Sequence, residues 1–436
     1  MKEEENLRKD SIKIGLLGLG TVGTGVVKVL KENGENIQKK VGVPVTIEKV
    51  LVRDINKKRK VELLPGKLTT NVDDILEDPT IDIVVEVMGG ENPALSYIIK
   101  ALHKGKQVVT ANKELIAKHG KEIFEAADCT TSDILFEASV CGGIPIVRPL
   151  KRCLAGNKIE SIMGIVNGTT NYILTKMTKE GAEFKDVLRE AQEKGYAEAD
   201  PSADIDGHDA IRKIVILASI AFNTRVSLDQ VYFEGIRKIE QVDIQYAKEL
   251  GYTVKLLAIA RDDNDEIEVR VHPAFIPNTH PLAAVSDVYN AVFVKGNAVG
   301  ETMFYGKGAG ELPTASAVVG DIIDAARNLV HENKGRISCT CFENKKVKSP
   351  EEIVSKYYVR IQVLDQPGVL ASLAAAFGNN QVSLKSVIQT RARGEKAEVV
   401  VITHDIKEKN ILKSIQDLKN LAVVDEVSNV IRVEDI

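Results

Sequence analysis

The densest set of residues able to do chemistry lies in residues 195–213, GYAEADPSADIDGHDAIRK. This short segment carries acidic and basic side chains, namely Glu198, Asp200, Asp204, Asp206, Asp209, Arg212 and Lys213. A partly buried carboxylate cluster needs nearby cations or protonation to be stable. Asp209 and Lys213 are four residues apart, so on a helix they share one face. The segment predicts a substrate or catalytic site, and a solvated helix start is the alternative.

A glycine-rich motif follows the first apolar run and fits the pattern G-x-G-x-x-G with Gly18, Leu19, Gly20, Thr21, Val22 and Gly23. In this pattern Gly18 permits a tight turn, Gly20 lets the backbone approach a pyrophosphate, and Gly23 allows close helix packing. The motif therefore predicts a dinucleotide at a helix N-terminus. After the second apolar run, Arg53 could hold a 2′-phosphate, which favours NADP, while Asp54 keeps NAD possible.

Two polar segments follow apolar runs farther along the chain. Lys113 comes directly after QVVTAN and opens a helix, at the sheet edge where parallel sheets bind ligands. A cation there opposes the helix dipole, so its placement indicates function, with an ordinary surface lysine as the alternative. The segment VNGTTNYIL places Asn167, Thr169 and Thr170 just before a helix, which suits either ligand binding or a helix cap.

The segment EASVCGGIP, residues 137–145, combines an acid, a cysteine and two glycines. Gly142 and Gly143 allow the backbone to aim several carbonyl oxygens at one point beside the Glu137 carboxylate, and oxygen ligands select a hard cation. Cys141 could instead act as a thiol nucleophile. No histidine lies near it in sequence, and free cysteines are most often small buried side chains, so the cation is favoured.

These segments need elements that position them. Short apolar runs alternate with amphipathic stretches over residues 1–137, with helices expected at 22–33, 93–105 and 113–128. This order predicts an α/β, Rossmann-type doubly wound parallel sheet that binds NAD(P). Residues 138–342 mix helices and strands and predict a second domain of the α+β type. A helix near residues 313–328 is expected to return to the nucleotide-binding domain.

The C-terminal region predicts a separate small domain. The charged stretch at residues 343–356 contains Pro350 and is expected to be a linker. Residues 357–436 follow the order strand, helix, strand, strand, helix, strand, which is typical of the ferredoxin-like βαββαβ unit.

Composition argues against several classes of protein. The formal net charge is −4 and no basic face is clustered, so we expect no nucleic-acid partner. The apolar run at residues 214–222 is much shorter than the about 20 residues that span a bilayer, so no membrane segment is expected. The charged N-terminus lacks the apolar core of a secretory signal, and the 5 cysteines show no zinc or disulfide spacing. A cytoplasmic location is expected.

Five segments within residues 12–335 closely resemble, in their order, the motifs of homoserine dehydrogenases. They are GLGTVG, VVTANK, EASVCGGIP, VNGTTNYIL and GYAEADPSADIDGHDAIRK. The tail, with DQPGVL at residues 365–370, resembles an ACT regulatory domain. Such enzymes interconvert L-homoserine and L-aspartate 4-semialdehyde with NADP or NAD, on the route to threonine and methionine. The resemblance implies a small-molecule oxidoreductase that forms a homodimer or a higher homo-oligomer. It also implies that residues 138–342 are the catalytic, homoserine-binding and dimerisation domain.

The resemblance also implies roles for individual residues. Glu198 and Asp209 hold the substrate, Lys213 and Lys113 lie at the reacting carbon, and Asp204 supports them. Proton transfer is assigned to Lys213, with Lys113 as the competitor, because burial and a neighbouring cation can bring a lysine pKa toward the working pH. Where some relatives carry adjacent carboxylates, this chain has Ala203 before Asp204.

Further binding residues are implied in the same way. A Na⁺ or K⁺ ion is expected at Glu137 and the backbone oxygens of Val140, Gly142 and Ile144. Additional cofactor contacts are expected near Gly195 and Gly308. In the ACT-like tail, Asp365 and Gly368 are expected to bind an amino-acid effector, with L-threonine favoured because it is a pathway product.

Two other functions fit parts of the sequence. A phosphorylating semialdehyde dehydrogenase would use Cys141 covalently and would need phosphate and an activating histidine. A non-catalytic amino-acid sensor would use the Rossmann-like and ACT-like units without cofactor reduction.

Overall fold

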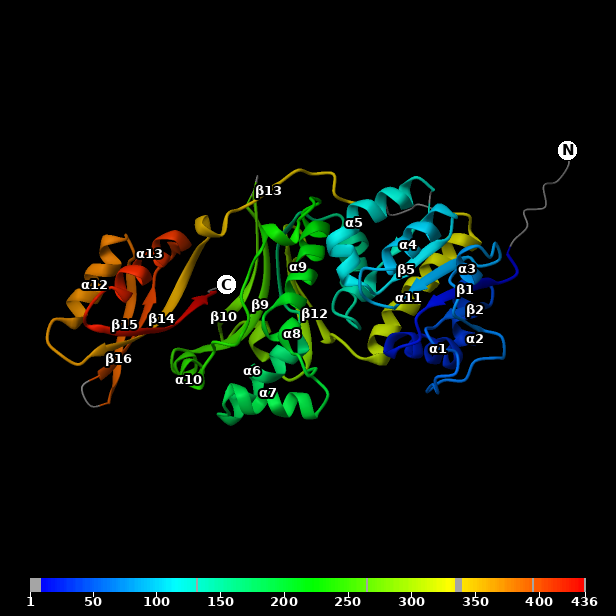
Figure 1. Cartoon of the computed structure of the whole chain (residues 1–436). Coiled ribbons are helices and arrows are strands. Elements are labelled where there is room, and N and C mark those ends of the chain that lie inside the picture. Colours follow the sequence, from blue (N-terminus) through cyan, green and yellow to red (C-terminus); the bar gives the residue numbers. More distant parts are fainter. Residues whose placement is uncertain (1–8, 131, 264–265, 334–338, 394–395, 435–436) are drawn as a thin grey trace. The chain divides into compact units, whose positions relative to one another are not determined.

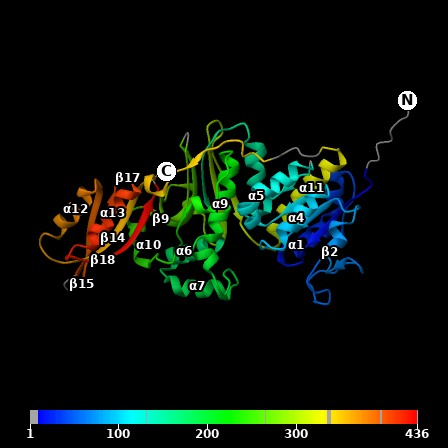
Figure 2. The same cartoon turned by 45° about the horizontal axis from the view of Figure 1, so that its top comes forward.

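The computed structural model describes residues 9–130, 132–263, 266–333, 339–393 and 396–434. The chain divides into two compact units, each built from separate stretches of sequence. The first comprises Met1–Ile159, Val215–Leu228 and Asn290–Asn344, and the second comprises Glu160–Ile214, Asp229–Tyr289 and Lys345–Ile436. Figures 1 and 2 label the elements of both units and colour them along the sequence.

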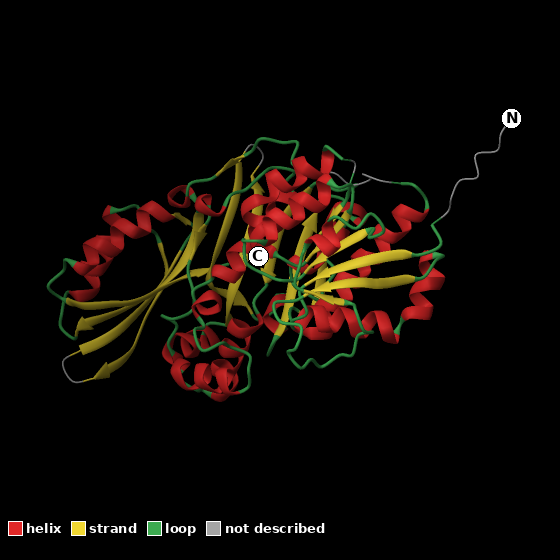
Figure 3. Cartoon of the chain, turned by 45° about the vertical axis from the view of Figure 1, so that its right-hand side comes forward, coloured by secondary structure: helices red, strands yellow, loops and turns green. Residues whose placement is uncertain are grey.

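The first unit contains a six-stranded parallel sheet in the order β3-β2-β1-β4-β5-β6. Its strands are β1 (Ile12–Leu17), β2 (Val45–Leu51), β3 (Leu68–Thr69), β4 (Ile83–Glu86), β5 (Gln107–Thr110) and β6 (Ile134–Leu135). The helices that connect them are α1 (Thr21–Glu32), α2 (Gly34–Val41), α3 (Asp73–Leu76), α4 (Ala94–His103) and α5 (Lys113–Asp128). Figure 3 shows these strands between red helices. The predicted Rossmann-type fold is confirmed, and the strand order reverses between β1 and β4, where such sheets bind ligands.

A helix from far along the chain completes the core of this sheet. Helix α11 (Glu311–Val330) packs against α1, and its apolar face joins β1 and α1 in one cluster. A Cβ at Gly25 would lie 2.6 Å from the Glu311 carbonyl oxygen and 2.8 Å from the Ala315 Cβ, so a glycine permits this close crossing. The unit also contains η1 (Glu137–Ser139), η2 (Pro149–Cys153), β11 (Tyr289–Gly296) and β12 (Gly300–Lys307).

The second unit is built around long strands that join the central region to the C-terminal domain. Its strands lie in the order β7 (Ile159–Ile165), β9 (Tyr252–Asp263), β10 (Glu266–Pro277), β18 (Val424–Val433), β14 (Val354–Leu364), β16 (Lys396–Thr403) and β15 (Leu384–Arg393). Short strands β8 (Tyr232–Phe233), β13 (Lys346–Val347) and β17 (Ile406–Lys407) pair at their side. The helices are α6 (Gly168–Glu180), α7 (Phe184–Glu193), α8 (Ser202–Ile205), α9 (His208–Ala221), α10 (Gln241–Glu249), α12 (Val369–Asn379) and α13 (Glu408–Lys419).

The C-terminal elements β14, α12, β15, β16, α13 and β18 follow the predicted βαββαβ order and enclose their own apolar core. The preceding charged stretch, residues 343–356, was expected to be a linker, and it contains ordered elements. Strand β13 pairs with β10, and β14 begins at Val354. Lys345 and Lys348, on either side of β13, form ion pairs of 2.7 Å with Asp262 and Asp263 of β9, so these charges of the stretch are paired.

Helix α9 is preceded by the short helix α8, and Gly207, with a φ of +90°, lies between them. Several elements were not foreseen. Helix α10 and strand β12 were missed in the sequence. In the described part of the chain, no helix has the length and apolar character needed to span a membrane.

Candidate active site

The glycine motif forms the turn between β1 and α1, as the pattern requires. Gly18 has a φ of +105°, and a Cβ at Gly23 would lie 2.3 Å from the Gly18 carbonyl oxygen. A Cβ at Gly20 would meet nothing within 4 Å, so this residue faces open space. The first turn of α1, which starts with Thr21 and Val22, carries no acidic side chain. A glycine backbone that faces open space at a helix N-terminus fits a pyrophosphate.

The loop after β2 carries the residues expected to choose between NADP and NAD. Arg53 and Asp54 are both exposed, and the Asp54 carboxylate accepts a hydrogen bond of 2.8 Å from the Asn56 amide. The Arg59 guanidinium donates to the carbonyl oxygens of Ile55, at 3.1 Å, and of Lys57, at 2.7 Å. The loop is therefore shaped by Arg59, while Arg53 lies directly after the strand where a ribose would be bound.

Lys113 is positioned by a buried polar network that the sequence did not reveal. The Glu86 carboxylate, at the end of β4, accepts a hydrogen bond of 2.6 Å from the Thr110 hydroxyl at the end of β5. Thr110 in turn accepts from the Asn112 amide at 3.0 Å, and the Asn112 side chain caps α5 by accepting from the Leu115 amide. The residues at the ends of strands β4 and β5 thus hold the half-buried Lys113 at the first position of α5.

The Glu137 carboxylate does not face the glycine turn that follows it. It accepts hydrogen bonds from three backbone amides, at 2.6 Å from Ile146, 2.9 Å from Val147 and 2.7 Å from Arg148. Three donors already occupy most of its acceptor sites, and a cation at this turn stays a prediction. A cation here would need backbone carbonyl oxygens. The described residues contain no group of three or more His, Cys, Asp or Glu side chains suited to a metal ion.

The turn after Glu137 is closely packed. Cys141 has a φ of +55° and is fully buried, which is unfavourable for a nucleophile that must reach a substrate. A Cβ at Gly142 would lie 2.5 Å from the Gly308 carbonyl oxygen, and the Gly143 amide donates to the Lys307 carbonyl oxygen at 3.1 Å. Glycines therefore allow this turn to contact the segment after β12.

In the second unit, the polar segments around Asn167 and Asp209 form one cluster. The Asn167 side-chain amide donates to Asp204 at 2.7 Å and to Asp209 at 2.9 Å. The Lys213 ammonium donates to Asp209 and to the Val166 carbonyl oxygen, each at 2.6 Å. This cluster, called here the substrate cluster, brings together three predicted residues, Asp204, Asp209 and Lys213.

Asn167 holds the substrate cluster at the start of α6. Its side-chain oxygen accepts from the Thr170 amide at 2.9 Å, so the same side chain caps the helix and holds the carboxylates. Thr169 donates to the Tyr196 carbonyl oxygen at 2.7 Å and fixes the loop before Glu198. The motif was compatible with a helix cap or with ligand binding, and Asn167 has the cap geometry together with contacts to Asp204 and Asp209.

Not all acidic residues of the segment join the substrate cluster. Asp206 pairs with Arg237, and Asp200 accepts from the Ser202 amide at 3.1 Å. Glu198 is exposed, and the Gln192 side chain holds its carbonyl oxygen at 3.1 Å. Gly195, with a φ of +72°, is in the same exposed loop.

The negative charge of Asp204 is only partly compensated within the substrate cluster. Burial raises the pKa of Asp204 above its usual range, and the negative charge of Asp209 raises it further. The hydrogen bond from Asn167 and the positive charge of Lys213 oppose this rise without cancelling it. The carboxylate would therefore be stabilised by an additional cation, such as the ammonium group of an amino acid.

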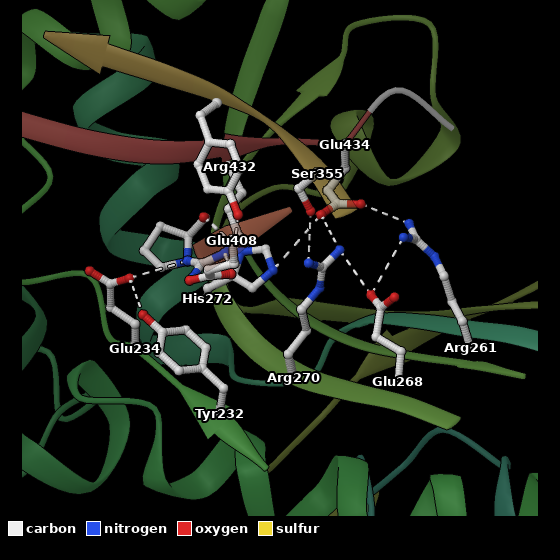
Figure 4. A network of polar contacts seen from close by, with 12 residues as sticks. Tyr232, Glu234, Arg261, Glu268, Arg270, His272, Ser355, Glu408, Arg432 and Glu434 are labelled. Carbon is white, nitrogen blue, oxygen red and sulfur yellow. Dashed lines mark hydrogen bonds and ion pairs between the residues drawn. The ribbon is translucent and has the colours of Figure 1, made fainter. Parts of the chain in front are cut away.

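The C-terminal domain is joined to the central strands by a second buried polar group of residues, called here the ion network (Figure 4). Arg270 on β10 contacts Glu434 at 2.7 Å and the Ser355 hydroxyl at 2.8 Å. Arg432 on β18 binds Glu408 and approaches Glu234 at 3.5 Å. Next to these contacts, β18 pairs in parallel with β10.

The expected effector loop lies at the other end of the C-terminal domain's first strand. Asp365 is exposed after β14, and Gly368 has a φ of +89° at the start of α12. This loop leaves the first amides of α12 without a side-chain cap, a geometry that suits a carboxylate.

A nucleotide-binding sheet with a glycine loop, together with a buried lysine among carboxylates, defines an NAD-binding oxidoreductase of small amino-acid substrates. Family models agree with this class. The homoserine dehydrogenase NAD-binding domain matches residues 18–137, the homoserine dehydrogenase model matches residues 145–323, and the ACT domain matches residues 357–423.

Individual relatives cover nearly the whole chain. The homoserine dehydrogenase of Bacillus subtilis is 46% identical over 97% of this chain and 98% of its own length, and that of Synechocystis is 48% identical over 97% and 99%. The crystal structure of a homoserine dehydrogenase from Thiobacillus denitrificans superimposes with a TM-score of 0.92 at 43% identity, covering 98% of both chains. The chain belongs to the homoserine dehydrogenase family. These comparisons do not favour the phosphorylating semialdehyde dehydrogenase or the sensor.

Proposed function

We propose that the substrate cluster binds L-homoserine and that Lys213 carries the proton of its hydroxyl group. The reaction of the family is the reversible interconversion of L-homoserine and L-aspartate 4-semialdehyde with NAD(P). The proposal is carried by one observation: the Lys213 ammonium is buried and lies 2.6 Å from both the Asp209 carboxylate and the Val166 carbonyl oxygen. Such contacts hold the amine in one orientation, as general acid–base catalysis requires.

The other residues would orient the substrate. Burial raises the pKa of Asp204 more than its polar neighbours lower it, so Asp204 and the exposed Glu198 suit the α-ammonium group. Asp209 would hold both substrate and Lys213. Lys113, which belongs to the first unit, remains the competing proton carrier because Glu86 and Asn112 fix its position at a strand end.

The assay for this function is direct. Adding L-homoserine with NADP or NAD should increase the absorbance of reduced nicotinamide, and adding L-aspartate 4-semialdehyde with the reduced cofactor should decrease it. No absorbance change with either cofactor in either direction would refute the assignment.

The cofactor would bind at the glycine turn, with Gly18, Gly20, Thr21, Val22 and Gly23 beside its pyrophosphate. NAD(P) supplies the acceptor of the hydride that leaves the alcohol carbon. Gly195, in an exposed loop, and Gly308, in a closely packed turn, would add further contacts to the cofactor. A solved homoserine dehydrogenase of a hyperthermophilic archaeon, 28% identical, is described in complex with NADPH.

Arg53 provides a test of cofactor preference. We propose that its guanidinium contacts the 2′-phosphate that only NADP carries. Arg53→Ala should then raise the KM for NADP by roughly tenfold or more, the equivalent of one charge-assisted hydrogen bond, and leave the KM for NAD nearly unchanged. Equal losses with both cofactors would limit Arg53 to a structural role.

A Na⁺ or K⁺ ion is proposed at the turn formed by residues 137–144. With the Glu137 side chain engaged by amides, the ligands would be backbone oxygens of Glu137, Val140, Gly142 and Ile144. Titration of the protein with NaCl or KCl against choline chloride at constant ionic strength should change its melting temperature. Identical melting curves in all three salts would contradict the site.

The ACT domain binds an amino-acid effector as a class. We propose that the effector is L-threonine and that it binds near Asp365 and Gly368, where the first amides of α12 lack a side-chain cap. Contacts from another part of the C-terminal domain reach the segment that carries Asp204. Arg432 contacts Glu234, and the neighbouring Ile236 amide donates to the Ile205 carbonyl oxygen at 2.8 Å, beside Asp204 on α8.

The effector proposal is tested in the full-length chain, because deletion of the ACT domain would remove β18 from its pairing with β10 and leave Arg270 without Glu434. Asp365→Ala should weaken inhibition by L-threonine without changing the KM for homoserine. Calorimetry with threonine, methionine, lysine and isoleucine identifies the ligand, and no heat with any of them would contradict the proposal.

We also propose that the protein forms a homodimer. Strand β12 alternates partly buried and exposed residues, and Met303 and Tyr305 expose 41% and 54% of their surface. An exposed strand with large apolar side chains favours pairing with another copy. Sedimentation of the wild-type protein and of Tyr305→Lys should show a dimer and a weakened dimer, and a monomeric wild type would contradict the proposal.

A further inference from the structure

A pair of cysteines in the first unit lies outside the site described above. Cys339 and Cys341 are separated by one residue, and both are partly exposed. The Phe342 amide donates to the Thr340 carbonyl oxygen at 3.0 Å, so the backbone turns tightly at Cys341. Residues at this spacing have Cα atoms no farther apart than about 7 Å, which is the upper limit for a disulfide, so a bridge requires a curved backbone between them.

Positive charge surrounds the pair. The Arg225 guanidinium donates to the Cys339 sulfur at 3.1 Å. The Cys341 thiol points to the Ser219 carbonyl oxygen at 3.9 Å, at the end of α9. Lys151 lines the same pocket, with its ammonium 5.4 Å from the centre of the Phe124 ring. The pocket is therefore apolar on its walls and cationic near the sulfur atoms.

These contacts divide the two thiols into a nucleophile and its partner. A hydrogen bond from Cys341, together with the positive charges of Arg225 and Lys151, lowers the pKa of Cys339 to about 5. The hydrogen bond to Cys339 and burial raise the pKa of Cys341. These contacts favour the thiolate on Cys339 and the protonated thiol on Cys341.

We propose that Cys339 and Cys341 form a thiol–disulfide exchange site that accepts small disulfides bearing carboxylate groups. The Cys339 thiolate attacks one sulfur of the disulfide R–S–S–R, which forms Cys339–S–S–R and releases R–S⁻. Cys341 then loses its proton to solvent and attacks the Cys339 sulfur, which closes the Cys339–Cys341 disulfide and releases the second R–S⁻. Two protein thiols are oxidised, and the small disulfide is reduced to two thiols.

The cationic pocket explains the choice of partner. Arg225 and Lys151 attract a carboxylate-bearing disulfide and stabilise the thiolate that attacks it. The other cysteines provide internal controls, since Cys129 and Cys153 are exposed and Cys141 is buried. Arg225 and both cysteines lie outside the residues assigned to catalysis, so turnover of homoserine reports whether a variant is folded.

The test uses 5,5′-dithiobis(2-nitrobenzoate), a disulfide with two carboxylates, on the full-length Cys129→Ser/Cys153→Ser protein at pH 6. We expect two thionitrobenzoate anions released per chain and a product without adduct, because the ring closes. In the same protein with Cys341→Ser, one anion should be released, and the adduct should stay on Cys339, as located by mass spectrometry.

Rates test the role of the charge. Cys339 should react roughly tenfold faster than Cys129 and Cys153 of the wild type, because its larger thiolate fraction at this pH outweighs the lower nucleophilicity of a low-pKa thiol. Arg225→Gln should remove most of this advantage, while Arg225→Lys should retain it. The neutral disulfide 2,2′-dithiodipyridine should respond less to Arg225→Gln. If Cys339 reacts no faster than the exposed cysteines, or if the adduct persists with Cys341 present, the proposal fails.

Discussion

The two buried polar assemblies of the second unit differ in how completely their charges are paired. In the ion network, burial would raise the pKa of Glu434, but Arg270 and Arg261 outweigh it and leave this pKa lowered. In the substrate cluster, burial also raises the pKa of Asp204, and there the hydrogen bond from Asn167 and the charge of Lys213 do not outweigh it. In the ion network, positive charge compensates the buried Glu434 carboxylate, whereas a further cation would stabilise the Asp204 carboxylate of the substrate cluster.

This difference separates a structural assembly from a binding site. A network whose buried charges are all paired holds β10 and the C-terminal strands in one arrangement. Moving β10 or the C-terminal strands would leave a buried charge unpaired. An under-compensated carboxylate costs stability in the free protein and is relieved when a substrate ammonium arrives. Variants in the two assemblies should therefore separate effects on turnover from effects on stability.

The largest expected effect is on turnover. Lys213→Ala removes the proposed proton carrier from the substrate cluster, and general acid–base catalysis contributes roughly 10²–10⁴-fold in rate. We expect kcat to fall by about that factor while NAD(P) binding, measured by fluorescence of the reduced cofactor, is retained. Lys113→Ala is the matched comparison, and a Lys213→Ala enzyme with normal kcat at every pH would transfer the role to Lys113.

The next largest effect is on stability. Arg432→Met leaves the buried Glu408 carboxylate without its guanidinium, and breaking a buried pair from one side costs about 3–5 kcal/mol. Chemical denaturation should show this loss, whereas the kcat of the folded enzyme without effector should change little. Lys396→Met, which breaks the exposed pair with Asp425, is the control and should leave stability nearly unchanged. Equal stability of both variants would contradict a network whose buried charges are all paired.

A neutral side chain at position 204 should separate function from stability. The folded-state pKa of Asp204 is raised, so folding favours its protonated form and its contribution to stability decreases as pH rises from its ordinary value of 3.8 through the raised value. Asp204→Asn should remove this part of the pH dependence of the melting temperature and should raise the KM for homoserine. A variant that melts with the wild-type pH profile would show that Asp204 titrates normally.

The smallest expected effect tests whether the unpaired charge of Glu408 causes the loss of stability in Arg432→Met. Adding Glu408→Gln to Arg432→Met removes the uncompensated negative charge while keeping a side chain that can bond the Tyr357 hydroxyl, now 3.1 Å from the carboxylate. The double variant should therefore be more stable than Arg432→Met alone, by roughly 1–3 kcal/mol. Additive losses in a double-mutant cycle would show that the two side chains act independently.

Local sequence signals predicted several elements correctly. Helix α5 begins at Lys113 and ends at Asp128 as expected, because a continuous apolar strand and a helical period flank it. The glycine motif has the conformations that its spacing requires, since positive φ and close packing are local demands on Gly18 and Gly23. In contrast, the residues 343–356 were expected to be a linker, because their pairing with Asp262, Asp263 and β10 cannot be read from a charged stretch alone.

The sequence by itself determined the residue types of the site, the Rossmann-type and ACT-like units and the family, because these depend on motifs and periodicity along the chain. Tertiary structure alone decided which acids act together. Asp204 and Asp209 meet through Asn167, whereas Asp206 turns to Arg237, and the Glu137 carboxylate is taken by amides of residues 146–148. The physical reason is that burial and hydrogen-bond partners come from segments distant in sequence, and these set the charge that each carboxylate can carry.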